Sequence, residues 1–138
     1  MVTIRQATER DSAAIARIQL ACPEAAQWPV GDYSNFSILL ALTEERPAGF
    51  CAWRQVAADE AELLNLAVDP ALRRTGVGAA LLTELCATAR GDIFLEVAVP
   101  NAAAIDLYRK LGWESVALRK GYYDHGKTDA VVMKKRSW

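Results

Sequence analysis

Residues Arg73 to Gly78 place two arginines beside two glycines, in the sequence Arg-Arg-Thr-Gly-Val-Gly. The stretch follows an apolar run that ends at Asp69-Pro70 and precedes an amphipathic segment from Ala79 to Ala89. The first N–H groups of a helix have no internal partners, and the helix dipole adds positive charge there. Glycine lets a ligand approach the backbone, and arginine suits phosphate oxygens. The stretch therefore predicts a site for a pyrophosphate-bearing ligand.

Two other phosphate-binding loops do not fit this stretch. A P-loop requires glycine, four residues and then Gly-Lys-Ser/Thr, a string that does not occur in the chain. The dinucleotide fingerprint requires a third glycine, but Ala79-Ala80-Leu81 follows Gly78. A plain strand-to-helix turn with solvated arginines remains the alternative, because one Gly-x-Gly turn is weak evidence.

Glu96 is a carboxylate within an otherwise apolar run, Ile93 to Val99. In a strand its side chain shares a face with Phe94 and Ala98, opposite the face that holds Leu95. Burying an unpaired carboxylate is costly, so Glu96 is paired, hydrogen-bonded or open to a cleft. One reading is a structural ion pair with a nearby arginine. The other is a general base that removes a proton from an amine.

Tyr108 and Asn101 lie two helical turns apart on one face of a predicted helix. Tyr108 shares a stripe with Ile105 and Leu111, so a core aromatic is the simpler interpretation. Asn101 precedes the helix and is a natural N-cap. Gly112 follows the helix, where a left-handed C-terminal cap belongs.

Several motifs follow the arginine–glycine turn in order. They are Leu95-Glu96-Val97, Asn101-Ala102-Ala103-Ala104-Ile105, Leu107-Tyr108 and Leu111-Gly112-Trp113, and their order resembles the acetyl-coenzyme A site of the GNAT superfamily. The first two, together with Leu66-Ala67-Val68-Asp69-Pro70 and Tyr122-Tyr123, resemble more closely the ribosomal-protein-alanine N-acetyltransferase family. The resemblance is dense from Glu62 to Lys135 and thin before it. Gly121 departs from it, since the family has asparagine there.

The resemblance implies acetyl-coenzyme A as the donor and a direct transfer in a ternary complex. It gives Glu96 the role of general base and Tyr108 that of assisting the departing thiolate. The donor-binding residues that it implies are Leu66, Ala67, Val68, Arg73, Arg74, Thr75, Gly76, Val77, Gly78, Ala79 and Asn101. Within this set, Arg73 is a flanking contact and the Leu66–Val68 backbone stabilises the oxyanion.

The resemblance places the acceptor, a protein or peptide N-terminus, at Tyr122 and Tyr123. Asn65 and Trp28 are further acceptor-side candidates. A ribosomal protein is one acceptor that the family implies. A lysine side chain, a polyamine or another small amine is an alternative acceptor, and a non-catalytic acyl-coenzyme A-binding module is a second alternative.

Composition narrows the class of protein further. The 138 residues suit one domain, 1–138, and no run is long enough to span a membrane. The formal net charge of -1 argues against direct nucleic-acid binding. A single histidine argues against a multi-histidine metal site, and no metal is expected. Three cysteines and the lack of a signal pattern favour reduced thiols in a cytoplasmic protein.

The hydrophobic pattern predicts a mixed α/β domain. Helices are expected at Ser12–Ala21 with Asp11 as N-cap, at Ala79–Ala89 and at Ala102–Leu111. Strands are expected at Val2–Arg5, Phe36–Leu42, Ala48–Ala57, Ala61–Val68, Ile93–Val99, Trp113–Arg119 and Ala130–Lys135. Trp28 to Asn35 and the Tyr122-Tyr123 pair are expected in loops. The family resemblance implies a GNAT fold: a mostly antiparallel sheet, splayed between strands four and five, with helices on both faces.

Overall fold

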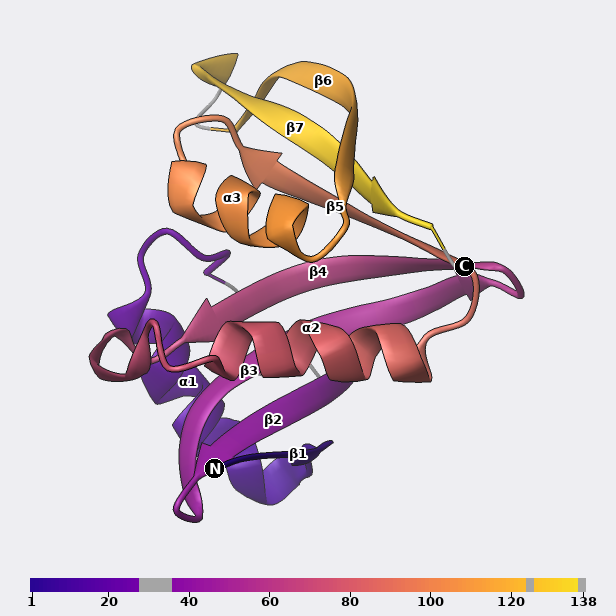
Figure 1. Cartoon of the computed structure of the whole chain (residues 1–138). Helices are drawn as coiled ribbons and strands as arrows, with labels where there is room; N and C mark the ends of the chain where they lie inside the picture. Colours follow the sequence, from indigo (N-terminus) through magenta and orange to yellow (C-terminus); the bar gives the residue numbers. More distant parts are fainter. Residues whose placement is uncertain (28–35, 124–125, 137–138) are drawn as a thin grey trace. The chain divides into compact units, whose positions relative to one another are not determined.

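The computed structural model describes residues 1–27, 36–123 and 126–136 (Figure 1). Its helices and strands are β1 (Val2–Gln6), α1 (Ser12–Ala21), β2 (Ser37–Thr43), β3 (Arg46–Ala57), β4 (Glu60–Val68), α2 (Val77–Thr88), β5 (Asp92–Ala98), α3 (Ala102–Lys110), β6 (Glu114–Tyr123) and β7 (Thr128–Lys135). The predicted element order is confirmed. The expected loop from Trp28 to Asn35 lies outside the described residues. No helix of the described residues is long and apolar enough to cross a membrane.

The strands form one seven-stranded sheet in the order β1-β2-β3-β4-β5-β7-β6. The pairs β1–β2, β2–β3, β5–β7 and β6–β7 are antiparallel. Strands β4 and β5 are parallel, and their pairing covers only Glu60–Glu62 against Asp92–Phe94. The mixed, mostly antiparallel sheet and the short pairing between its fourth and fifth strands are thus confirmed.

The chain divides into two compact units. Unit 1 comprises Met1–Arg54 and Leu64–Thr88, and unit 2 comprises Gln55–Leu63 and Ala89–Trp138. Strand β4 contributes residues to both units. That residues 1–138 act as a single domain stays a prediction.

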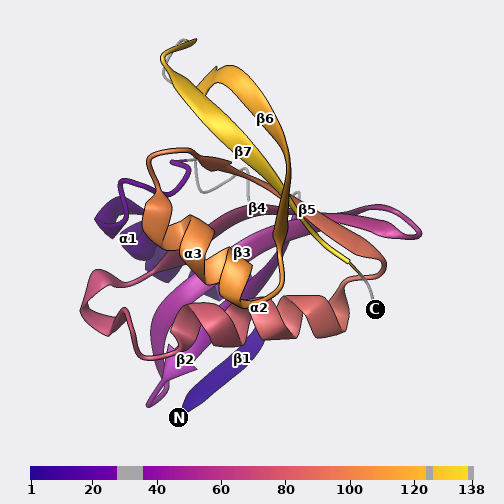
Figure 2. The ribbon, with the colours of Figure 1, turned by 45° about the horizontal axis from the view of Figure 1, so that its top comes forward.

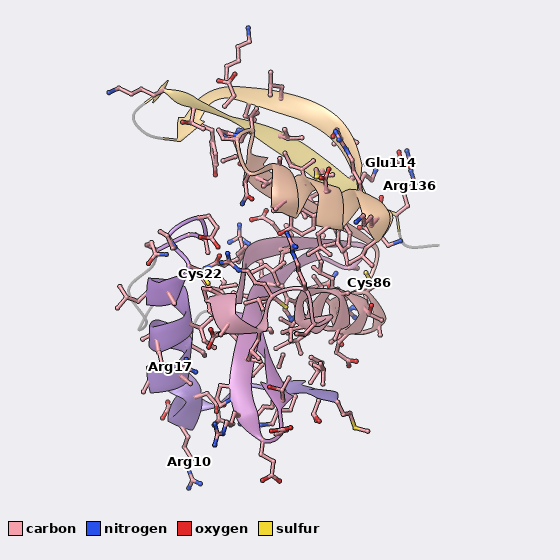
Figure 3. All side chains as sticks on the ribbon, turned by 60° about the vertical axis from the view of Figure 1, so that its left-hand side comes forward. Arg10, Arg17, Cys22, Cys86, Glu114 and Arg136 are labelled. Carbon is pink, nitrogen blue, oxygen red and sulfur yellow. The ribbon has the colours of Figure 1, made fainter. Side chains whose placement is uncertain are left out.

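In unit 1 the two helices lie on opposite sides of the strands, as Figure 3 shows. Ile15 and Ile18 of α1 pack with Phe50 of β3 in the buried core. Gly49 faces the other way, because successive strand residues point to opposite faces. A Cβ at Gly49 would lie 3.1 Å from Val77 Cγ1 and 2.8 Å from the Ala67 carbonyl oxygen. The glycine therefore lets the start of α2 pack directly on β3.

In unit 2 the residues of β5 alternate between buried and half-buried. Ile93, Leu95 and Val97 are buried, whereas Glu96 is half-buried, as the alternation in the sequence predicts. The β6–β7 hairpin is strongly curved (Figure 2), and β6 is interrupted by register shifts at two places. Such bulges bend a strand and re-aim its side chains.

Asp11 is the N-cap residue of α1, as predicted, but its side chain makes no capping hydrogen bond to this helix. Its carboxylate accepts bonds from the Arg5 guanidinium at 2.9 Å and from the Thr8 N–H at 2.8 Å. Because a charged guanidinium offers two donors in one plane, it holds the carboxylate more strongly than a helix N–H would.

The three cysteines are free, and they lie on separate elements. Cys51 is buried in β3, and burial raises the pKa of its thiol to about 12. Cys22 is buried at the end of α1 and Cys86 is half-buried on α2, as Figure 3 shows. The expectation of free rather than disulfide-bonded thiols is confirmed.

Candidate active site

The predicted phosphate-binding turn in unit 1 joins β4 to α2. Asp69 first closes a short 3-10 turn, since its carboxylate accepts the Ala71 N–H at 3.0 Å. Arg74 and Gly76 then adopt positive φ angles of 65° and 88°. Helix α2 starts at Val77, and the Ala80 N–H donates a hydrogen bond to the Gly76 carbonyl oxygen. The amides that precede Ala80 have no acceptor within the helix and suit an anion.

The two arginines of this turn differ in their contacts. Arg73 forms an ion pair with Glu24, and its guanidinium lies 3.6 Å from Cys22 Sγ. Arg74 is exposed and forms no ion pair among the described residues. The charge of Arg73 is thus balanced by Glu24, whereas the side chain of Arg74 is exposed to solvent. Nothing lies within 4 Å of a Cβ built on Gly76, so the turn leaves open space for an anion.

The end of β4, Leu66 to Val68, carries the backbone groups predicted to bind the donor. Ala67 is buried and its two neighbours are half-buried. The Val68 carbonyl accepts the Cys22 thiol at 3.1 Å. A carbonyl has a second lone pair, so this contact leaves Val68 able to accept another bond. Burial is the main cause that raises the pKa of Cys22, which keeps it a neutral donor.

Glu96 in unit 2 forms an ion pair that the sequence predicted only as an alternative to catalysis. The Arg119 guanidinium donates to Glu96 Oε1 at 2.7 Å. The Glu96 side chain is 29% exposed and that of Arg119 is 52% exposed. Glu96 is therefore partly exposed, although its second oxygen, Oε2, is buried. A structural ion pair and a general base are compatible roles for this residue.

Tyr122 completes a cluster with these two side chains. The Arg119 guanidinium lies 4.2 Å from the centre of the Tyr122 ring, a cation–π distance. The pKa of Tyr122 is raised by burial, then by a hydrogen bond with Glu96 and by the charges of Glu96 and Glu62, while Arg119 opposes the rise. The hydroxyl therefore stays protonated and donates to the Glu96 carboxylate.

The prediction that Tyr122 and Tyr123 lie in a loop is wrong, because both belong to β6. Gly121 adopts a φ of 64°, and its N–H donates to Asp129 Oδ1 at 2.8 Å. Arg119 pairs with Ala130 and Tyr123 pairs with Thr128, so β6 carries a bulge between them. Asparagine is among the few other residues that accept this φ, which explains the glycine at this point of the motif.

Asp129 is a site-supporting residue whose role the sequence did not reveal. Its carboxylate holds the bulge that precedes Tyr122. A local signal existed in Gly121, since glycine in a strand often marks a bulge. The pairing of the two residues depends on the register of β6 on β7, which the sequence alone does not fix.

Helix α3 positions Asn101 and Tyr108 as predicted. The Asn101 side chain accepts the Ala104 N–H at 3.3 Å and so caps the helix. Tyr108 is 7% exposed, and its ring centre lies 5.8 Å from that of Trp113. Gly112 ends the helix with a φ of 98°. The expected core packing of Tyr108 is therefore present, and it holds the phenol in a fixed place.

Asn65 is buried and bonded to the backbone of Ala26. Its Oδ1 accepts the Ala26 N–H at 3.2 Å, and its Nδ2 donates to the Ala26 carbonyl at 3.0 Å. Asn65 thus anchors the segment that follows α1. Trp28, the other acceptor-side candidate, lies outside the described residues.

Comparison with known proteins identifies the family of this chain. Residues 5–113 match the acetyltransferase (GNAT) family. The chain belongs to the GNAT acetyltransferase family. The [ribosomal protein bS18]-alanine N-acetyltransferase of Escherichia coli strain K12 is 42% identical over 107 residues, covering 73% of this chain and 70% of that protein. The Salmonella typhimurium enzyme of the same name is 44% identical over 110 residues, covering 75% and 74%.

The crystal structure of the Escherichia coli ribosomal-protein-S18-alanine N-acetyltransferase has the same fold. It superimposes with a TM-score of 0.83 at 32% identity, covering 99% of this chain and 94% of that one. The GNAT chain described here is accordingly an N-acetyltransferase with acetyl-coenzyme A as donor. The alternative of a non-catalytic module is wrong. The open, positively charged turn at Arg74 and Gly76 fits the pyrophosphate of this donor.

Proposed function

We propose that this chain acetylates the N-terminal α-amine of a protein, and that the acceptor is the N-terminal alanine of ribosomal protein bS18. The proposal rests on one observation, the 42% and 44% identity to enzymes named for that reaction, over about three quarters of the chain. Because their named substrate is a ribosomal protein, we expect the reaction to take place in the cytoplasm.

The donor-binding roles are proposed as follows. Acetyl-coenzyme A supplies the acetyl group as a thioester. Arg74 and the amides of Gly76 to Ala79 hold its pyrophosphate, with Thr75 shaping the turn through a bond to the Leu72 carbonyl. The backbone of Leu66 to Val68 binds the pantetheine arm and polarises the thioester carbonyl. Asn101 adds a polar contact, while Arg73 flanks the turn.

Glu96 is proposed as the base that takes the proton from the acceptor amine. An α-ammonium has a pKa of about 7.7–8.0, so roughly a quarter to two fifths of it is already neutral at pH 7.5. A lysine ammonium, with a pKa of about 10.4, is neutral in roughly one molecule per thousand. A carboxylate is a weak base, and it therefore suits an α-amine better than a lysine. Tyr108 assists the departing thiolate.

Recognition of the acceptor is proposed for the end of β6. Tyr122 offers a 45% exposed ring and a polar hydroxyl beside Glu96. Tyr123 follows it in the strand, and Asn65 acts by holding Ala26. A lysine side chain or a polyamine remains the alternative acceptor, since the chemistry at the acetyl group would be the same.

A peptide panel tests the acceptor. Coenzyme A release is measured with a peptide that has a free N-terminal alanine and contains one lysine, and with the same peptide blocked at its N-terminus. Spermidine is the third substrate, and intact bS18 protein is the fourth. We expect release with the free peptide and with bS18, and mass spectrometry should place the acetyl group on the α-amine. Comparable rates with the blocked peptide or with spermidine would overturn the proposal.

A further inference from the structure

Arg119 reaches Glu96 across an intervening strand. Arg119 on β6 pairs with Ala130 on β7, and Ala130 pairs with Ala98 on β5. Cross-strand partners share a face of the sheet, so Arg119 and Glu96 are on the same face. The side chains at Ala98 and Ala130 are small, and Ala130 is fully buried. The long arginine side chain therefore has room to pass over β7 to the carboxylate.

The guanidinium of Arg119 is held by more than its salt bridge. The Tyr122 ring packs against it at 4.2 Å, and the Tyr122 hydroxyl bonds to the same carboxylate. Asp129 fixes the Gly121 bulge that directs Tyr122. An exposed ion pair alone contributes little, because two long side chains must be ordered to form it. Here the Arg119 side chain is also ordered by the Tyr122 ring, and the Gly121 bulge and the β6–β7 pairing hold that ring in place.

Other charged groups lie on the same face of the sheet, among them Glu114, which pairs in register with Lys134. Glu62 on β4 pairs in register with Phe94, so it lies on the same face and its charge acts on Tyr122. Lys134 on β7 is bonded to Asp92 at 3.1 Å and lies 5.3 Å from the Phe94 ring centre. Arg119 is a cation in direct contact with Glu96.

We propose that Arg119 is a positioning residue for the base, holding the Glu96 carboxylate in one orientation while an acceptor approaches it. The inference rests on the proposed role of Glu96 as base. A base that is already held in its reactive geometry lowers the barrier, because less order has to be gained in the transition state. Arg119 touches neither the donor nor the reacting atoms in this role.

The test measures kcat and the KM for acetyl-coenzyme A in Arg119→Gln, Arg119→Lys and the control Lys120→Gln. Lys120 adjoins Arg119 and is exposed, so its replacement removes the same charge from the same strand. In Arg119→Gln we expect kcat to fall about 10-fold while the KM for acetyl-coenzyme A stays unchanged, because the base is no longer held in one orientation. Arg119→Lys should restore most of kcat, and Lys120→Gln should match the wild type.

A second readout does not depend on turnover. The ionisation of the tyrosines is followed by NMR on 13C-labelled protein. The pKa of Tyr122 should rise further in Arg119→Gln, because the cation that lowers it is gone. It should fall in Glu96→Gln, because the carboxylate that raises it is gone. Thermal melts confirm that each variant is folded.

The outcomes separate this inference from the proposed function. If Glu96→Gln is inactive and Arg119→Gln keeps the wild-type kcat, the positioning role is wrong and the base assignment stands. If Glu96→Gln keeps full turnover, the base assignment fails and the inference fails with it. An equal loss of kcat in Arg119→Gln and Arg119→Lys, together with lower melting temperatures, would identify the pair as structural only.

Discussion

Arg73 forms an ion pair with Glu24, which follows α1 in the chain, whereas the adjacent Arg74 extends from a left-handed turn without such a partner in the described residues. The ion pair with Glu24 ties the turn to the segment that follows α1. In the proposed function the two neighbours thus have separate roles, since Arg73 holds the turn and Arg74 binds the pyrophosphate of the donor.

The first prediction follows from this division. Arg74→Gln should raise the KM for acetyl-coenzyme A about 10-fold, since a charge-assisted bond to a phosphate contributes about 1.5–3 kcal/mol. Arg73→Gln should change this KM much less and should lower the melting temperature instead. Steady-state kinetics and thermal unfolding of both variants make the comparison. A larger KM effect in Arg73→Gln would reverse the assignment.

The second prediction concerns the base. Glu96→Gln keeps the size of the side chain and its place beside Arg119, but it cannot accept a proton. Turnover should fall by about 10²–10⁴-fold, the usual contribution of a general base. Binding of coenzyme A, measured by calorimetry, should stay within about twofold because the pyrophosphate turn is untouched. Wild-type turnover in Glu96→Gln would contradict the role of Glu96 as general base.

The third prediction separates packing from chemistry at Tyr108. The ring packs against Trp113, and Tyr108→Phe keeps that contact. We therefore expect a melting temperature close to the wild type and a turnover lowered about 100-fold, because the proton that assists the thiolate is gone. Tyr108→Leu serves as the packing control and should lose stability as well. Full activity in Tyr108→Phe would leave the tyrosine with a structural role only.

The fourth prediction tests the close approach at Gly49. Gly49→Ala forces a Cβ against the Ala67 carbonyl and Val77. Overpacking of this kind costs about 1–3 kcal/mol, and we expect the free energy of unfolding in urea to fall by that amount. Gly76→Ala is the matched comparison, since its Cβ meets open space and only the positive φ is strained. Equal stability of Gly49→Ala and the wild type would contradict the packing argument.

The sequence predicted what local pattern controls. The alternation in β5 placed Glu96 opposite the buried face, and the helix signals placed Asn101 and Gly112 at the ends of α3. What it did not predict depends on register between distant strands. The bulges in β6 determine which residues of the β6–β7 hairpin lie opposite each other. The contacts of Arg119 with Glu96 and of Asp129 with Gly121 depend on that register. The sequence also did not show that the Asp11 carboxylate bonds to the Arg5 guanidinium and not to a helix N–H.

This last contact gives the protein a predictable response to acid. The pKa of Asp11 is lowered to about 2, first by its bonds to Arg5 and then, against the opposing effect of burial, by the Thr8 N–H. A carboxyl group whose folded-state pKa is depressed stabilises the fold above its ordinary pKa and loses that contribution as the pH falls toward 2. For Asp11, whose side chain is about nine-tenths buried, the shift corresponds to about 2 kcal/mol at neutral pH.

The fifth prediction is therefore that Asp11→Asn unfolds in urea with a free energy about 2 kcal/mol below the wild type at pH 7. The difference should shrink between pH 4 and pH 2, as the wild-type carboxylate takes up its proton, and it should be nearly gone at pH 2. Asp106→Asn is the control, because Asp106 is exposed on α3, and it should follow the wild type at every pH. If Asp11→Asn and the wild type keep a constant difference down to pH 2, the ion pair with Arg5 is not the source of the stability.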